Sequence, residues 1–370
     1  MSSSISGSDP GSDPAGDGGL SPTRYLAIAG ATCVAVFALV WAWVAFMPLA
    51  YLDPEYPAWL AKERLLAACD VGSVLVVGDS RAAVDVMPRR LPGRVVNLAV
   101  GGGEPIEAYS VLRRALACPH PPQRIVVSFD AAHFTAPDLF WERSVAFGFV
   151  GPAAVARLRA VSARLDDWSV YALRRPALLP PGLRAAAYAV HFPTLYFAAL
   201  GRAGGFLRWW ENRRALAAVL TARGQYFFGT APGSAVVAAE GHLRRFRPLP
   251  VLDWYFDRLL RLAAARGIPV DFVAMPMNSA TWRAVRPGVQ AGFAAYLAGY
   301  AARYPNLRIV GPVMPHWPDR YFGDGYSHLN PAGAARYSVA FGRWLGREQT
   351  AQRPRNTGRR FSMKEAVASR

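Results

Sequence analysis

The stretch Ser73-Val-Leu-Val-Val-Gly-Asp-Ser80 decides the fold. Its first five residues form an almost continuous apolar run, which is typical of a strand buried on both faces of a parallel sheet that helices cover. The run ends at Gly78-Asp79-Ser80, and a short helical pattern, Arg81–Met87, follows it. The stretch therefore predicts the first strand of an α/β domain and the turn that leads into a helix.

The chain on either side repeats this alternation of strand and helix. Four more strands are predicted at Val95–Val100, Arg124–Phe129, Pro269–Ala274 and Leu307–Val310. The helices are predicted at Pro57–Ala68, from Pro105 to Ala117, and at Leu252–Arg266, Val289–Tyr304 and Pro331–Leu345. Strands that alternate with helices favour right-handed βαβ units, and so a parallel sheet with helices on both faces.

Composition divides the chain into six predicted segments. They are a disordered tail (1–24), a transmembrane helix (25–48), the first part of the α/β domain (57–136), a helical insertion or cap (137–233), the second part of the domain (234–346) and a basic tail (347–370). A hydrophobic content of 52% excludes a disordered chain. Three cysteines exclude a fold built on disulfides, and no spacing of Cys and His suggests a zinc module.

The segment Tyr25–Met47 is uncharged and almost wholly apolar. As a helix it would span about 35 Å, enough to cross the hydrocarbon core of a bilayer. A cleavable signal peptide is the alternative, but its apolar run is shorter, about 7–15 residues, so we favour an uncleaved single-pass anchor. The flanking charges do not fix the orientation; an extracytoplasmic domain is a hypothesis. The apolar stretch Ala185–Leu200 is short for a second span and favours a buried or interfacial helix.

The chain has 42 basic and 25 acidic residues, a formal net charge of +17. Such a balance favours anionic partners such as phospholipid head groups or acidic glycans, although a general bias toward arginine explains it equally well. No motif for binding nucleic acid is present, so we do not expect a nucleic-acid partner.

Polar residues gather at positions where a parallel sheet places its ligands, beyond the carboxyl ends of the strands. Ser80 follows the first strand, Gly102 follows the second, and Asp324 and His328 precede the last helix. A serine hydroxyl becomes a nucleophile when a nearby base takes its proton, and a carboxylate best orients that base. The N–H groups of Ser80 and Gly102 are candidate donors to a developing oxyanion.

These motifs resemble those of the SGNH (GDSL-like) hydrolase superfamily. The resemblance lies in Val-Val-Gly-Asp-Ser80, in Asn-Leu-Ala-Val-Gly-Gly-Gly103, and in the late Asp and His followed by Leu-Asn-Pro-Ala-Gly333. It implies a flavodoxin-like three-layer α/β/α sandwich, and a serine acyl-enzyme that needs no cofactor or metal. Its residues would be Ser80 as nucleophile, His328 as base, Asp324 as orienting carboxylate and Gly102 as oxyanion donor.

Two departures from the family pattern stand out. Asp130 occupies the position after the third strand where the family has an asparagine that donates to the oxyanion, and an ionised carboxylate only accepts hydrogen bonds. His133 is the nearby group that could replace the missing donor. The family's Asp usually precedes its His by three positions, whereas Asp324 precedes His328 by four.

With one anchor before the domain, the chain looks most like the membrane-bound branch linked to O-acylation of extracellular polysaccharides. The resemblance thus implies an esterase or O-acyltransferase with a glycan or ester substrate, lipid contact through the helix, and a membrane protein that donates the acyl group as a candidate partner. Lipid or small-ester hydrolysis, and a non-catalytic subunit of an envelope polysaccharide complex, are alternatives. In a flavodoxin-like order Cys69 and Cys118 precede neighbouring strands, so a disulfide between them is open.

Overall fold

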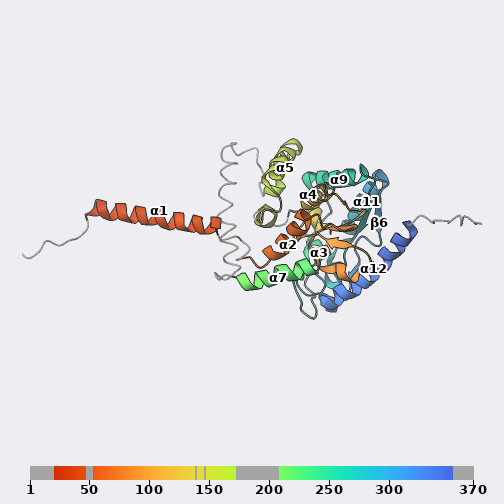
Figure 1. Cartoon of the computed structure of the whole chain (residues 1–370). Helices are drawn as coiled ribbons and strands as arrows, with labels where there is room; N and C mark the ends of the chain where they lie inside the picture. The colour runs from red at the N-terminus through yellow and green to blue at the C-terminus, as the bar shows by residue number, and fades with distance from the viewer. Residues whose placement is uncertain (1–20, 47–52, 138–139, 146, 172–207, 353–370) are drawn as a thin grey trace, which may run out of the picture. The chain divides into compact units, whose positions relative to one another are not determined.

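The computed structural model describes residues 21–46, 53–137, 140–145, 147–171 and 208–352 (Figure 1). Two compact units divide the chain, Met1–Pro48 and Leu49–Arg370. The first contains the helix α1 (Pro22–Phe46), which is long and apolar enough to cross a membrane. The predicted helix at Ala185–Leu200, most of the N-terminal tail and most of the C-terminal tail lie outside the described residues.

The second unit contains a five-stranded parallel sheet in the order β2-β1-β3-β4-β6. Its strands are β1 (Val74–Gly78), β2 (Val95–Asn97), β3 (Arg124–Ser128), β4 (Val270–Val273) and β6 (Leu307–Val310). Each matches a predicted strand to within a few residues. A small second sheet, which the sequence did not predict, pairs β5 (Met277–Asn278) with β7 (His316–Trp317).

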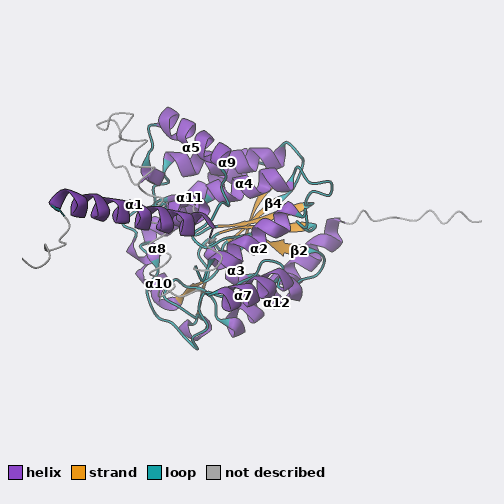
Figure 2. Cartoon of the chain, turned by 60° about the vertical axis from the view of Figure 1, so that its left-hand side comes forward, coloured by secondary structure: helices purple, strands orange, loops and turns teal. Residues whose placement is uncertain are grey.

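Helices cover both faces of the main sheet (Figure 2). Alternate residues of β1 show this directly: Leu75 and Val77 belong to the apolar cluster that includes α4, α9 and α11, while Val74 and Val76 pack with α3 and α12. The continuous apolar run arises because both faces of the strand are buried. The helices are α2 (Tyr56–Ala67), α3 (Ser80–Asp85), α4 (Pro105–Ala115), α5 (Pro152–Leu165), α7 (Trp209–Thr221), α8 (Ala239–His242), α9 (Pro250–Ala264), α10 (Ser279–Ala284), α11 (Pro287–Arg303) and α12 (Pro331–Gln352).

Although the N–H groups of Leu98 and Val100 still donate to carbonyls of β1, the strand β2 ends three residues before the predicted limit, at Asn97. Its side-chain oxygen accepts a hydrogen bond from the N–H of Ala99, and its amide nitrogen donates to the carbonyls of Ala82 and Val86. These bonds join the end of β2 to α3. They place the turn at 99–103 beside the first residues of α3.

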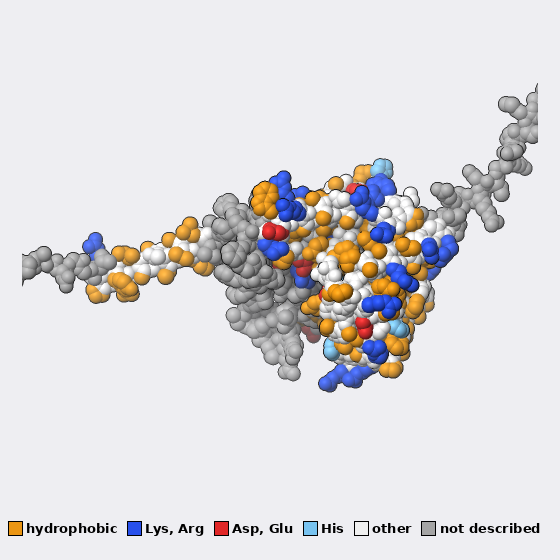
Figure 3. Space-filling view, turned by 90° about the horizontal axis from the view of Figure 1, so that it is seen from below, with side chains coloured by type: hydrophobic (Ala, Val, Ile, Leu, Met, Phe, Trp, Pro, Cys, Tyr) orange, Lys and Arg blue, Asp and Glu red, His pale blue; other side chains and the backbone are white. Residues whose placement is uncertain are grey.

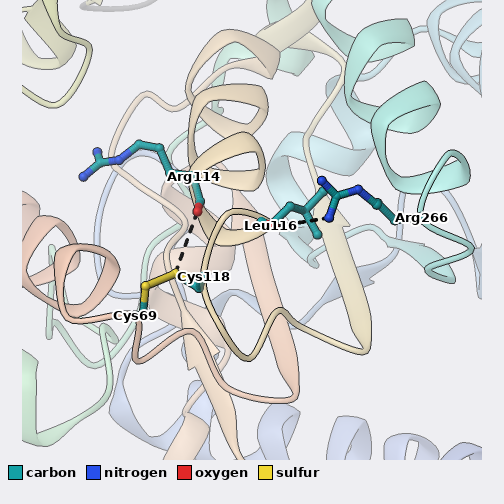
Figure 4. The surroundings of a disulfide bond; sticks show 5 residues. All are labelled: Cys69, Arg114, Leu116, Cys118 and Arg266. Carbon is teal, nitrogen blue, oxygen red and sulfur yellow. Dashed lines mark hydrogen bonds between the residues drawn. A yellow bond between two sulfur atoms is a disulfide. The ribbon is translucent and has the colours of Figure 1, made fainter.

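A disulfide joins Cys69 to Cys118, whose Cα atoms lie 5.5 Å apart (Figure 4). The two cysteines follow α2 and α4, at the amino-terminal edge of the sheet and away from the predicted site. Next to Cys118, the side chain of Arg266 donates to the carbonyl of Leu116 at 3.3 Å. The sequence left this pairing open, and the structure contains it.

Candidate active site

Ser80 is the first residue of α3 and lies directly after the end of β1. Asp79 forms the N-cap of this helix, and its carboxylate accepts the N–H groups of Arg81 at 3.0 Å and Ala82 at 3.2 Å. Gly78 has a positive φ of 150°, and a Cβ there would collide with the carbonyl of Ser128 on β3. Glycine is therefore required where β1 turns into the serine.

Ser80, His328 and Asp324 lie in one hydrogen-bonded line. The Oγ of Ser80 is 2.7 Å from Nε2 of His328, and Nδ1 of the same ring is 2.5 Å from Oδ2 of Asp324. These three side chains come from positions 80 and 324–328, which are separated by most of the domain. The structure thus brings together three side chains that the sequence singles out.

The loop that carries His328 holds Asp324 in an ionised state. The other oxygen of Asp324 accepts the N–H groups of Tyr326 at 2.9 Å and His328 at 3.3 Å. Burial by itself would raise the pKa of Asp324, but the hydrogen bond and the charge of His328 outweigh it and lower this pKa. A carboxylate in this position can orient the imidazole and stabilise its protonated form.

Asp324 precedes His328 by four positions instead of three, and the backbone of Ser327 accommodates the extra residue. Its φ is 60°, in the left-handed region that serine seldom adopts. Ser327 is buried, and its Oγ lies 3.3 Å from Oγ1 of Thr281 and 3.4 Å from the N–H of Asn278. The loop is one residue longer than the family pattern, yet it still brings the carboxylate to the ring.

The turn with Gly102 lies against the end of β1. The carbonyl of Gly78 accepts the N–H of Val100 at 3.1 Å, and Gly103 packs on the same carbonyl. Gly102 has a φ of 64° and is buried. Within the part of the chain that the structure describes, no hydrogen bond engages the N–H of Gly102 or of Ser80. Both groups remain candidate oxyanion donors.

Asp130 and His133 belong to a buried charge network beside Ser80. Oδ1 of Asp130 accepts the N–H groups of Ala132 at 2.7 Å and His133 at 3.2 Å, and Nδ1 of His133 lies 2.9 Å from it. The other carboxylate oxygen is 3.6 Å from Arg81. Burial would raise the pKa of Asp130, but the charges of His133 and Arg81 lower it. Asp130 is therefore an ionised acceptor.

Arg81 joins this network to two more distant segments. Its guanidinium lies 2.5 Å from the carboxylate of Glu240 on α8, and the side chain of Glu240 is completely buried. The Nε of Arg81 donates to the carbonyl of Tyr326 at 3.4 Å. Burial would lower the pKa of Arg81, but Glu240 and Asp130 raise it. Arg81, the residue after Ser80, thus fixes α8 and the histidine loop to the start of α3.

The side chains of Asp79, Asp130 and His133 lie close enough together to hold a metal ion, since one ligand atom of each lies within 4.8 Å of the others. However, the carboxylate oxygens of Asp79 already accept three backbone N–H groups, and those of Asp130 face N–H groups and a guanidinium. These donors occupy the positions that a cation would need. We interpret the cluster as an ion-pair network.

The sequence missed the aromatic wall of the site. Phe228 stacks on the ring of His328, with ring centroids 4.8 Å apart and planes at 28°. Phe228 comes from the segment after α7, which also donates the N–H of Tyr226 to the carbonyl of Ala83 on α3. The aromatic run Tyr226-Phe227-Phe228 is the sequence signal for this wall, although such runs more often pack in a core.

A pocket with about 260 Å³ of empty space, part of it open to solvent, adjoins the network beyond the carboxyl ends of β1, β3 and β4. Its lining combines polar and apolar side chains: Asp79, Arg81, Ser128, Phe129, Asp130, Ala131, Ala274, Met275, Met277, Val313 and Met314. Neither protein-family models nor curated protein sequences give a match to this chain.

Proposed function

We propose that the chain is a membrane-anchored serine esterase or O-acyltransferase of the SGNH type, acting on a cell-surface or exported polysaccharide. The observation that carries the proposal is the hydrogen-bonded line from Ser80 through His328 to Asp324. The strand order is the flavodoxin-like 2-1-3-4-5 arrangement when the strands of the main sheet are numbered along the chain, which agrees with the fold that the resemblance implies.

The proposed reaction forms and then resolves an acyl-enzyme. Oγ of Ser80 attacks the carbonyl carbon of the acyl donor while Nε2 of His328 takes its proton. The negative charge on the carbonyl oxygen would be met by the N–H groups of Ser80 and Gly102. The C–O bond of the donor then breaks, and His328 returns the proton to the departing alcohol. Water or a sugar hydroxyl attacks the ester in the same way, and Ser80 is released.

Three features of the chain favour an extracytoplasmic domain at a membrane surface. The disulfide between Cys69 and Cys118 is typical of oxidising compartments. The helix α1 supplies a means of holding the domain at a membrane. Figure 3 shows Lys and Arg side chains at many places on the visible face and few acidic ones, which suits an anionic lipid surface or an acidic glycan.

A fluorophosphonate probe tests the nucleophile. We expect the full chain in detergent micelles to be labelled once, at Ser80, and the label to disappear in Ser80→Ala. Ser73→Ala, seven residues earlier and at the other end of β1, is the matched control and should be labelled like the wild type. Absence of label on folded wild-type protein would refute the proposal.

A second test separates transfer from hydrolysis. An aryl acetate is supplied with an oligosaccharide, and acetylated sugar and free acetate are both measured. Acetyl on the sugar supports a transferase, whereas free acetate alone supports an esterase, including one for lipid or small esters.

A non-catalytic subunit of a polysaccharide complex is the second candidate. The observation in its favour is Asp130, an ionised acceptor where the family has a donor. The same probe decides between the two, because a scaffold would leave Ser80 unlabelled while binding glycan.

A further inference from the structure

Lys62 is a buried lysine that the proposed reaction does not use. It lies on α2, its exposed fraction is 1%, and its Nζ donates to the carbonyl of Ala99. Burial lowers the pKa of Lys62 to about 7, although the charge of Glu55 opposes this shift. Burying an ammonium group is costly unless it is paired, so its single hydrogen bond to a backbone carbonyl needs an explanation.

The carbonyl that Lys62 holds belongs to the turn that presents Gly102. Three N–H groups of this turn are bonded inward: Ala99 N–H to the side chain of Asn97 at 3.1 Å, Val100 N–H to the carbonyl of Gly78 at 3.1 Å, and Gly103 N–H to the carbonyl of Val100 at 3.1 Å. Asn97 thus holds the N–H of Ala99, and Lys62 holds its carbonyl. With these groups fixed, the free N–H of Gly102 has a defined position.

Glu55 fixes the same turn from the side of Gly101. A Cβ at Gly101 would collide with the carboxylate of Glu55, which is itself paired with Arg143 at 2.6 Å. Of the described elements packed against α2, Glu55 is the charged group that shifts the pKa of Lys62. Lys62 and Glu55 therefore contact the glycine turn at Ala99 and Gly101, and Arg143 pairs with Glu55.

We propose that Lys62 is a positioning residue that holds the 99–103 turn so that the N–H of Gly102 meets the developing oxyanion. The inference rests on the proposed function. Preorganised donors stabilise the transition state more than the ground state, so a donor that moves by a fraction of an ångström loses part of its effect. Because Asp130 supplies no donor, the reaction depends on the backbone N–H groups.

The test compares three variants of the full chain with an aryl acetate as substrate. Lys62→Met removes the charge and the donor but keeps a long side chain, and Lys62→Arg keeps both. Arg64→Met makes the same change of charge on the exposed face of α2. We expect kcat to fall about 10- to 100-fold in Lys62→Met with KM within twofold, since complete loss of an oxyanion donor costs about 10²–10³. Lys62→Arg should recover part of kcat, and Arg64→Met should match the wild type.

The pH dependence separates this role from a purely structural one. The wild-type lysine is charged below about pH 7 and donates more strongly in that form. The ratio of kcat between wild type and Lys62→Met should therefore decrease from pH 6 to pH 9. If Lys62→Met does not fold, the ratio between wild type and Lys62→Arg is measured instead, and it should decrease in the same way because arginine stays charged.

The outcomes keep the two proposals apart. A wild type that reacts at Ser80 together with a folded Lys62→Met of unchanged kcat overturns the role of Lys62 alone. A ratio that does not vary with pH overturns it as well. A folded wild type that does not react at Ser80 overturns the proposed function, and the positioning role with it.

Discussion

Replacing Asp130 by asparagine should destabilise the domain, and the loss should depend on pH. Asparagine keeps the shape of the side chain, and its oxygen can still accept the N–H groups of Ala132 and His133. The lost feature is the negative charge beside the imidazole of His133 at 2.9 Å and the guanidinium of Arg81 at 3.6 Å.

The expected loss is about 3 kcal/mol at pH 7. Breaking a buried ion pair by removing one partner costs about 3–5 kcal/mol. Here the lower figure applies because Arg81 keeps Glu240 as a partner at 2.5 Å. His133 has Asp79 at 3.6 Å as its remaining partner.

The sign of the pH dependence follows from the lowered pKa of Asp130. Burial raises this pKa, but His133 and Arg81 lower it below the unfolded value of 3.8. The folded state therefore binds the proton more weakly than the unfolded chain does. The stabilisation is complete above about pH 4 and is lost as the pH falls through the folded pKa. The difference in the free energy of unfolding between wild type and Asp130→Asn should therefore become smaller as the pH falls over that range.

Urea unfolding of the full chain in detergent micelles, followed by tryptophan fluorescence at pH 7, 5 and 3, measures this difference. Asp70→Asn is the control, because its pair with Arg94 is exposed and should contribute about 1 kcal/mol or less. A loss below 1 kcal/mol at pH 7, or a difference that stays constant down to pH 3, would refute the ion-pair interpretation of the network.

Two further predictions concern the catalytic line and the disulfide. Asp324→Asn should slow labelling of Ser80 by about 10⁴, because the imidazole loses the carboxylate that orients it; labelling within tenfold of the wild type would contradict this. Replacing Cys69 and Cys118 by serine should cost about 4 kcal/mol, from the unfolded-state entropy of a loop of 49 residues, measured by urea unfolding. Peptide mapping without reductant should find the two cysteines linked, and free thiols would contradict the pairing.

The strands of the sheet, and the residues of the line from Ser80 to Asp324, could be singled out in the sequence because both stand in local patterns. An apolar run such as Val74–Val77 indicates a buried strand by its own composition. A parallel sheet then brings the carboxyl ends of its strands to one edge. Ser80 and the loop of His328 follow from that rule. Glu107 also acts locally, since it forms a capping box with Glu104 at the start of α4.

The rest of the site depends on contacts between segments whose positions no local pattern fixes. Phe228 reaches His328 because the chain returns to the sheet after α7, through a region predicted as an insertion or cap. Glu240 lies in a helix of four residues, too short to predict from periodicity. Lys62 has the residue type of a surface position, and its burial follows from the packing of α2 against the turn at Ala99.

The remaining question is which groups can donate to an oxyanion beside Ser80. The side chain of Asp130 accepts hydrogen bonds only, and its backbone N–H already donates to Asp79 at 2.9 Å. The other oxygen of the Asp79 carboxylate caps α3, so Asp79 joins the turn after β3 to the start of that helix. The donors that the sequence predicts are the N–H groups of Ser80 and Gly102, and no hydrogen bond between described residues engages either of them. With two backbone donors and no side-chain donor from Asp130, each donor contributes a larger share of the stabilisation of the oxyanion. The reaction rate should therefore be most sensitive to the residues that hold the turn of Gly102.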